Sequence, residues 1–203
     1  GDKIGIANIT HNLGFTSREL GDLERARQYY EESLALRREI GDRSGIAISL
    51  NNLGTVASLQ KRYDDAIKLL QESVAAYRSL NDTNNIFMPL ANIGSAYLRL
   101  GHYDLAEKYF FETLDMTRNQ EVVSHHLESF NNFAELYHQR GLPEFSFELL
   151  EFLIHHPAAD ADLKRRVADL RAQIEPTLSA DTITRVRERA KRLDLDGIYL
   201  KIK

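Results

Sequence analysis

Two pairs of adjacent histidines are the residues in this sequence whose type most readily suggests chemistry. His125-His126 and His155-His156 carry imidazole nitrogens, which are common ligands of zinc and other transition metals. Neighbouring residues on a helix point in different directions, so neither pair can offer two ligands to one ion. The second pair also stands directly before Pro157, where a helix is expected to have ended. We therefore predict neither a metal site nor a cofactor.

Catalytic side chains receive no better support from the sequence. The acidic pairs Glu31-Glu32 and Asp64-Asp65 are typical of solvated helix faces. We find no phosphate-binding glycine loop, no nucleophile motif and no metalloprotease helix in the sequence. It contains no cysteine, which excludes thiol chemistry and favours a reducing cytoplasm, and no stretch apolar enough to span a membrane. We predict a non-enzymatic, cytoplasmic protein.

The elements that carry these residues follow an internal repeat. When the 203-residue chain is offset by forty it overlays itself: GDKIGIANITHNLG at residue 1 becomes GDRSGIAISLNNLG at 41, NDTNNIFMPLANIG at 81 and EVVSHHLESFNNFA at 121. The register is shown by three recurring sets: Asn12, Asn52, Asn92 and Asn132; Gly14, Gly54, Gly94 and Ala134; and Ala26, Ala66, Ala106 and Ser146. A fixed period of this length predicts a solenoid of stacked units.

Each unit has the pattern of two helices joined by a short break. In the second copy two apolar faces recur at helical spacing, first Ile46, Leu50, Leu53 and Ala57, then Ala66, Leu70, Val74 and Tyr77. The break contains a glycine in the other copies, as a helix end prefers: Gly21, Gly101 and Gly141. Three aspartates are placed to cap the following helix: Asp22, Asp64 and Asp104.

Small residues should set the distance between the two helices of each unit. Antiparallel helices approach closely only where side chains are small, so Gly14 and Ala26, with their counterparts, are the expected contact points. One hairpin cannot bury its apolar face alone, so neighbours must stack. We predict an all-α superhelix of four helical hairpins with a concave inner wall. The hairpins span residues 1–40, 41–80, 81–120 and 121–156, and C-terminal capping helices and a tail span 160–203.

Two parts of the chain depart from the regular pattern. Pro89 falls inside the first helix of the third copy and should delay its start to about Asn85 or kink it. Beyond the fourth copy, one further helix is predicted to end before Pro176 and to cover the fourth hairpin with an apolar face formed by Leu163, Val167, Leu170 and Ile174. Asp181 is placed to cap another helix. The final alternation, Ile198, Leu200 and Ile202, predicts a short strand or an extended tail.

The C-terminal segment is basic in an otherwise acidic chain. Residues 163–203 contain eleven Lys or Arg and six Asp or Glu, whereas the whole chain has a formal net charge of −4. Such a segment could contact nucleic acid or an acidic neighbour. Because acidic residues are interspersed, we interpret it as a solvated helix face and do not expect nucleic acid as a partner.

The repeat resembles the tetratricopeptide repeat, which has small residues where this chain has Gly54, Ala66 and Ser73 and a bulky apolar residue at Leu70. The usual unit has about 34 residues, and the longer form resembles the repeats of kinesin light chains and of bacterial regulators. The phrase YYEESLALRREIGDRSGIAISLNNLG is especially similar to the C-terminal sensor regions of bacterial signal-transduction ATPases of the STAND class. The resemblance covers residues 1 to about 155, and it implies a tetratricopeptide solenoid that binds other proteins.

The resemblance also implies where a partner would bind. In this family the first helix of each repeat lines the concave groove, with the residues three before and one after the small position facing a ligand. These positions, with residues one turn onward and apolar neighbours, are His11, Phe15, Arg18, Asn51, Thr55, Ser58, Leu59, Met88, Ser95, Leu98, Arg99, Asn131, Glu135 and His138. Amide side chains can pair with an extended peptide, and apolar ones can add selectivity. The repeated asparagines beginning at Asn12 are instead expected to bond between helices.

Three functions remain open at this point. The first is a protein- or peptide-binding scaffold that serves as the sensor or interaction arm of a larger bacterial regulator. The second is a peptide receptor of the quorum-sensing kind, which an upstream DNA-binding or effector region would distinguish. The third is a self-assembly module that associates through its end repeats or its tail.

Overall fold

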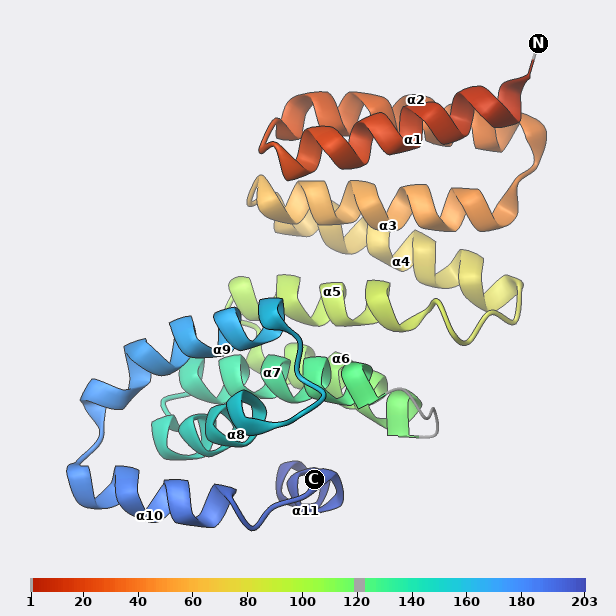
Figure 1. Cartoon of the computed structure of the whole chain (residues 1–203). Coiled ribbons are helices and arrows are strands. Elements are labelled where there is room, and N and C mark those ends of the chain that lie inside the picture. The colour runs from red at the N-terminus through yellow and green to blue at the C-terminus, as the bar shows by residue number, and fades with distance from the viewer. Residues whose placement is uncertain (1, 119–122) are drawn as a thin grey trace. The chain divides into compact units, whose positions relative to one another are not determined.

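The computed structural model describes residues 2–118 and 123–203, and the regular elements within these ranges are helices (Figure 1). The chain divides into two compact units, Gly1–Ala106 and Glu107–Lys203. The first contains α1 (Lys3–Glu19), α2 (Leu23–Ile40), α3 (Arg43–Leu59), α4 (Tyr63–Ser79), α5 (Phe87–Arg99) and the start of α6 (Tyr103–Arg118). The second contains the rest of α6, α7 (Val123–Gln139), α8 (Pro143–His155), α9 (Ala161–Ile174), a 3₁₀ turn (Glu175–Thr177), α10 (Ala180–Ala190) and α11 (Leu195–Ile202). The predicted all-α class is confirmed.

Within the first unit, two hairpins are held by the same contact forty residues apart. Helices α1 and α2 pair, as do α3 and α4, and Figure 1 shows the second hairpin stacked beside the first. The buried Ser33 hydroxyl donates to the Ala7 carbonyl at 2.8 Å, and the buried Ser73 hydroxyl donates to the Ala47 carbonyl at 2.8 Å. Each bond satisfies a buried polar side chain and fixes the register of its hairpin.

The small residues lie where the helices of these hairpins come closest. A Cβ atom placed on Gly14 would lie 2.8 Å from the Tyr30 ring, and one on Gly54 would lie 2.5 Å from Leu70 Cγ. Ala26 and Ala66 are completely buried on the facing helices. The close contacts therefore need residues this small, as predicted.

Aspartates lie at the starts of several helices, but they do not all act as caps. Asp22 caps α2 by accepting a hydrogen bond from the Arg25 amide, as predicted. The predictions for Asp64 and Asp104 were wrong, because α4 and α6 begin at Tyr63 and Tyr103 and both aspartates lie in the first turn.

In each of these turns the helix begins two positions after the left-handed residue, which is Gly21 before α2 at 80° and Gly101 before α6 at 77°; before α4 that residue is Lys61, with a φ of 61°. The residue that follows it, Arg62, is the N-cap of α4 and makes no side-chain cap bond. A further set of aspartates was not predicted: Asp2, Asp42 and Asp82 accept from the amide three residues on, at 2.9, 2.9 and 3.1 Å.

Pro89 delays the third hairpin, and the start of α5 lies at Phe87, two residues later than expected. Proline as the third residue of a helix costs no intrahelical hydrogen bond, because the first N–H groups have no partner in the helix. The preceding segment is a turn in which Asp82 accepts from the Asn85 amide. α5 is consequently shorter than α1 and α3 at its N-terminal end.

The second unit is built on the α7–α8 hairpin and an aromatic core. The buried Ser146 hydroxyl donates to the Ala134 carbonyl at 2.6 Å, so the two small positions of this copy touch directly. Phe133 packs edge-on against Phe110 with ring centroids 5.9 Å apart, and Phe130 packs against Phe152 at 6.2 Å. Aromatic side chains therefore fill much of the core of the second unit, where Phe130 and Phe133 stand at the repeat positions of Leu50 and Leu53.

Three C-terminal helices complete the second unit. α9 packs on α7 and α8 with Leu163, Val167 and Ile174 buried, which confirms the predicted covering helix; Leu170 is half-buried. α10 packs on α8, but its cap is Ser179 rather than Asp181, because the Ser179 hydroxyl accepts from the Thr182 amide.

The expected strand or extended tail was wrong, since the last residues form α11. Ile198 and Ile202 lie four apart on its buried face, whereas Leu200 is exposed. Asp194 caps α11 by accepting from the Gly197 amide at 2.8 Å. The Tyr199 hydroxyl then donates to Asp115 of α6 at 2.7 Å and ties the helix to the unit.

Candidate functional site

The polar positions of α3 and α5 meet in one hollow of the first unit. Five of the predicted groove residues line it: Thr55, Ser58, Leu59, Ser95 and Arg99. Tyr63, Asn92 and Ala96 complete the lining of a cavity of about 180 Å³. Hydroxyl, amide and guanidinium groups stand there beside an exposed leucine and a tyrosine ring. The hollow can therefore offer hydrogen bonds to a polar chain and an apolar contact to one of its side chains.

Asn92 is the residue of this hollow whose role was underestimated. Its amide nitrogen donates to Asn51 Oδ1 at 3.2 Å and to Thr55 Oγ1 at 3.3 Å, which joins α5 to α3. Asn52 makes the equivalent contact one repeat earlier, 3.4 Å from His11 Nε2 on α1. The expectation that these asparagines bond between helices is thus confirmed for Asn52 and Asn92. Asn92 also lines the hollow, which could not be predicted from its position in the repeat.

The predicted residues of α1 form a second polar and aromatic group. The Arg18 guanidinium lies 5.0 Å from the Phe15 ring centroid, a cation–π contact, and pairs with Glu19 at 2.8 Å. His11 is half-buried, with its ring 5.4 Å from Tyr30. Half of the Phe15 surface is exposed, so the ring is available for contact with a ligand.

Burial lowers the pKa of His11 below its ordinary value, and the positive charges of Arg37 and Arg18 lower it further. The unfolded chain then binds a proton more readily than the folded one, so stability present above the unfolded pKa of about 6.5 is lost as pH falls toward the folded pKa. We expect His11→Gln to weaken the loss of stability between pH 7 and pH 5. Urea unfolding at a series of pH values measures the effect, with the exposed His102→Gln of the same unit as the control. Equal slopes in wild type and His11→Gln would contradict the prediction.

Five further predicted positions differ in how much surface they expose. Leu98 is only 4% exposed and belongs to the core of the first unit, so it offers a ligand almost no surface. Met88, near the start of α5, is exposed. In the second unit Asn131 is buried on α7, while Glu135 and His138 are half-buried there. The spacing of Leu98 from the small residue of its repeat predicted that it faces the groove, but its side chain packs into the core instead.

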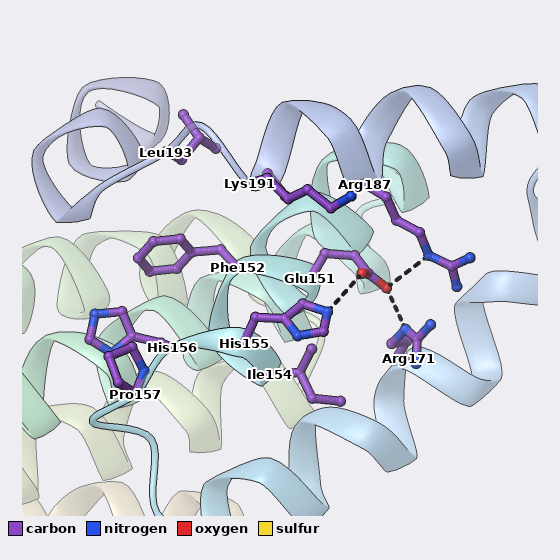
Figure 2. Close-up of a pocket in the computed structure, with 11 residues that line it drawn as sticks. Glu151, Phe152, Ile154, His155, His156, Pro157, Arg171, Arg187, Lys191 and Leu193 are labelled. Atoms are coloured by element: carbon purple, nitrogen blue, oxygen red, sulfur yellow. Dashed lines mark hydrogen bonds and ion pairs between the residues drawn. The ribbon is translucent and has the colours of Figure 1, made fainter.

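The histidine pairs do not assemble a metal site in the part of the chain that is described. Among residues 2–118 and 123–203, no three His, Asp or Glu side chains come together as metal ligands would. His125 and His126 lie half-buried on α7. His155 and His156 instead line a hollow of about 410 Å³ between α8, α9 and α10 (Figure 2).

Figure 2 shows that this second hollow is organised around the buried carboxylate of Glu151. Arg171 Nε lies 2.5 Å from that carboxylate, Arg187 Nε 3.6 Å and His155 Nε2 3.7 Å. Both arginines also pair with Glu175, at 3.3 and 2.6 Å. The positive charges of this hollow are therefore matched within the unit.

The basic C-terminal segment is paired in the same way on the rest of α8. Glu148, 1% exposed, accepts from Arg189 at 2.5 Å and from Lys201 at 2.5 Å. Arg185 reaches Glu144 at 3.0 Å, and Arg166 reaches Glu128 at 2.5 Å. The interpretation as a solvated face was wrong for Arg189 and Lys201, because their acidic neighbour is the buried Glu148 of α8 in the same chain, whereas Arg185 is 57% exposed. The signal was available as Glu144, Glu148 and Glu151 on one helix.

Two sequence segments match models of a single family. Residues 5–79 and residues 90–123 each match a tetratricopeptide repeat model, and together they cover more than half of the chain. The chain belongs to the tetratricopeptide repeat family. Tetratricopeptide repeats are protein-interaction scaffolds and are typically non-catalytic.

Solved tetratricopeptide structures share the fold at low sequence identity. BtubC (BKLC) from P. vanneervenii is similar over 98% of this chain and 84% of that protein, with a TM-score of 0.72 and 17% identity. The nearly identical TPR-like repeats of a kinesin light chain from Podosopora anserina are similar over 92% of this chain and 97% of that one, with a TM-score of 0.63 and 16% identity. No curated protein sequence matches this tetratricopeptide chain. None of its described helices has the length and apolarity to cross a membrane.

Proposed function

We propose that this tetratricopeptide chain binds an extended peptide segment of another protein. The peptide would lie along the side of α1, α3 and α5 that carries the predicted groove residues. The observation that carries the proposal is the hollow in which Ser58, Ser95 and Asn92 lie beside Leu59 and Tyr63. Hydroxyl and amide groups can bond to any peptide backbone, and the exposed leucine and tyrosine can select one apolar side chain.

The size of the hollow limits what can enter it. A cavity of about 180 Å³ is smaller than the roughly 300–1,000 Å³ of sites that enclose small ligands. It suits one side chain of a longer peptide rather than a free metabolite. The arrangement supports a binding role in which the peptide backbone runs across the first helices of successive repeats. We extend this role to Asn131, Glu135 and His138 of α7 as a separate part of the proposal.

A peptide selected from a displayed random library supplies the probe for this proposal. We expect Leu59→Glu to weaken the affinity of the selected peptide at least about tenfold, because a charge replaces the apolar contact and must lose water on binding. Fluorescence polarisation with the labelled peptide measures the affinity. Leu105→Glu, which alters another exposed leucine of the first unit outside the hollow, is the matched control. Equal losses for both variants, or a peptide that binds both normally, would refute the assignment.

The wider context is also a proposal. We infer that the scaffold is the sensor or interaction arm of a larger bacterial regulator, which the similarity of residues 29–54 to STAND sensor regions supports. Under this proposal the chain works in the cytoplasm and needs no cofactor. A peptide receptor of the quorum-sensing kind stays a prediction. Self-assembly through the end repeats or the tail likewise stays a prediction.

A further inference from the structure

The hollow between α8, α9 and α10 has the size of a site for a small molecule. Its volume is about 410 Å³, which falls within the roughly 300–1,000 Å³ of sites that enclose small ligands. The three helices all belong to the second unit, so one compact unit forms the whole hollow. Part of its lining is charged and part is apolar, and the two parts together indicate the class of ligand that it could hold.

One oxygen of the buried Glu151 carboxylate accepts no hydrogen bond from the described residues of the chain. The side chain is 4% exposed, and its Oε1 accepts from Arg171 Nε at 2.5 Å. Its Oε2 has only His155 Nε2 as an ion-pair contact among those residues, at 3.7 Å, which is too long for a hydrogen bond. A carboxylate oxygen that is removed from water is stabilised by a donor. Glu151 Oε2 can therefore accept a hydrogen bond from a ligand.

Donor groups of two arginines lie beside this carboxylate. Arg171 and Arg187 both pair with Glu175 through Nη2, at 3.3 and 2.6 Å, and Arg187 Nε lies 3.6 Å from Glu151 Oε1. In the described part of the chain, Nη1 of neither arginine makes a hydrogen bond, and the two side chains are 26% and 38% exposed. These N–H groups can therefore bind a ligand carboxylate.

The balance of charges in the hollow favours a ligand that carries both signs. Each cation of the lining is matched by carboxylates of the same unit: Arg171 and Arg187 by Glu151 and Glu175, and Lys191 by Glu188. An amine without an acid group would meet the guanidinium groups, and an acid without an amine would meet the carboxylates, so each would face its own charge. Because Arg187 and Glu151 lie only 3.6 Å apart, an ammonium and a carboxylate on one carbon atom could reach both.

The remaining lining is apolar and lies to one side of the charged groups. Figure 2 shows Phe152, Pro157 and Leu193 away from the two arginines. Ile154 and Ala190 also line the hollow. An apolar group of the ligand would leave water against these side chains, which favours binding.

We propose that this hollow binds a small zwitterion with an apolar side chain, of the class of the apolar α-amino acids. The ligand ammonium donates to Glu151 Oε2, and the ligand carboxylate accepts from Arg187. Its side chain lies against Phe152 and Leu193. The His155 side chain is 74% exposed, so its ring can turn aside to admit the ligand. The site would give the chain a small-molecule ligand in addition to the proposed peptide.

Isothermal titration calorimetry of the full chain with leucine, methionine and phenylalanine tests the proposal. We expect at least one of these amino acids to bind with a Kd below about 1 mM. For that amino acid, the amine that lacks the carboxylate and the acid that lacks the ammonium should each bind at least about tenfold more weakly, because each leaves one charged partner unmatched. The absence of binding by all three amino acids overturns the proposal, and so does equal affinity for an amino acid and either analogue.

Two variants place the binding in this hollow. Glu151→Gln should weaken amino-acid binding at least about tenfold, because it removes the charge that the ammonium contacts. Glu144→Gln, which alters a carboxylate of the same helix outside the hollow, is its control. Wild-type affinity in Glu151→Gln overturns the assignment.

The second variant keeps Glu151 and its arginine partners. Leu193→Glu places a carboxylate at the apolar side of the hollow and should also weaken binding at least about tenfold, because that charge must lose water against the ligand side chain. Leu200→Glu alters an exposed leucine of α11 outside the hollow and should bind as the wild type does. Equal affinities in Leu193→Glu and Leu200→Glu contradict the proposed position of the ligand side chain.

Discussion

Gly54→Leu is expected to unfold the hairpin formed by α3 and α4, with a loss of more than about 3 kcal/mol in the free energy of unfolding of the first unit. Even a Cβ atom at this position would lie 2.5 Å from Leu70 Cγ and 3.3 Å from the Ala66 carbonyl oxygen. Leu70 is completely buried and the Ala66 oxygen belongs to a helix backbone, so neither can move without displacing α4. Three further carbon atoms would force the helices apart.

Hydrogen exchange followed by mass spectrometry locates this effect, and urea unfolding followed by circular dichroism gives its size. Amides of α3 and α4 should lose protection while those of α8 in the second unit keep theirs. Gly101→Asn is the matched control, because a side chain there meets nothing within 4 Å and asparagine tolerates the left-handed φ of 77°. Wild-type protection in Gly54→Leu would show that the hairpin is not closely packed at this point.

Arg189→Met should destabilise the second unit by about 3 kcal/mol, because it removes a partner of a buried carboxylate. Glu148 is 1% exposed, and its partners are Arg189 at 2.5 Å and Lys201 at 2.5 Å. Arg189 also donates from Nη2 to Glu148 Oε2 at 2.8 Å, so without the guanidinium Oε2 loses this charged hydrogen bond while remaining out of water. The remaining contact with Lys201 should keep the cost near the lower end for a broken buried pair.

The test is a double-mutant cycle measured by urea unfolding. The combined variant Arg189→Met with Glu148→Met should regain most of the lost stability, because the buried carboxylate is removed together with its guanidinium partner and the remaining Lys201 side chain is 32% exposed and can reach water. Arg185→Met is the control: its partner Glu144 is partly exposed at 41%, so the loss should stay below about 1 kcal/mol. If Arg185→Met and Arg189→Met cost the same, burial of Glu148 does not determine the energetics of this pair.

The repeat and its small residues could be predicted from the sequence because packing geometry imposes them. Only glycine fits beside Tyr30 and Leu70. A glycine at this position of the repeat, such as Gly14 or Gly54, therefore indicates a closely packed hairpin. Helix starts were predicted less well, since several aspartates near a turn can all serve as caps. The position of the cap depends on which residue of the turn takes the left-handed conformation. Before α4 this residue is Lys61 and not a glycine.

The candidate site was predictable in part for the same kind of reason. Position in the repeat identifies which helix side faces the hollow, and Thr55, Ser58 and Ser95 do line it. Position does not reveal how a long side chain bends, so the burial of Leu98 was missed. The pairing of the basic segment with α8 depends on contacts such as Arg189 with Glu148, forty-one residues apart, which no local pattern encodes.

The hydrogen bonds from Asn92 to Asn51 and Thr55 link the third hairpin to the second. A bound peptide that donates a hydrogen bond to the Asn51 carboxamide oxygen must compete with the bond from Asn92. The cost is about 1 kcal/mol for each neutral hydrogen bond broken. Under the proposed peptide binding, a ligand that took the Asn51 oxygen would therefore weaken the polar contact between the second and third hairpins, so binding at α3 and the packing of α5 would be energetically coupled.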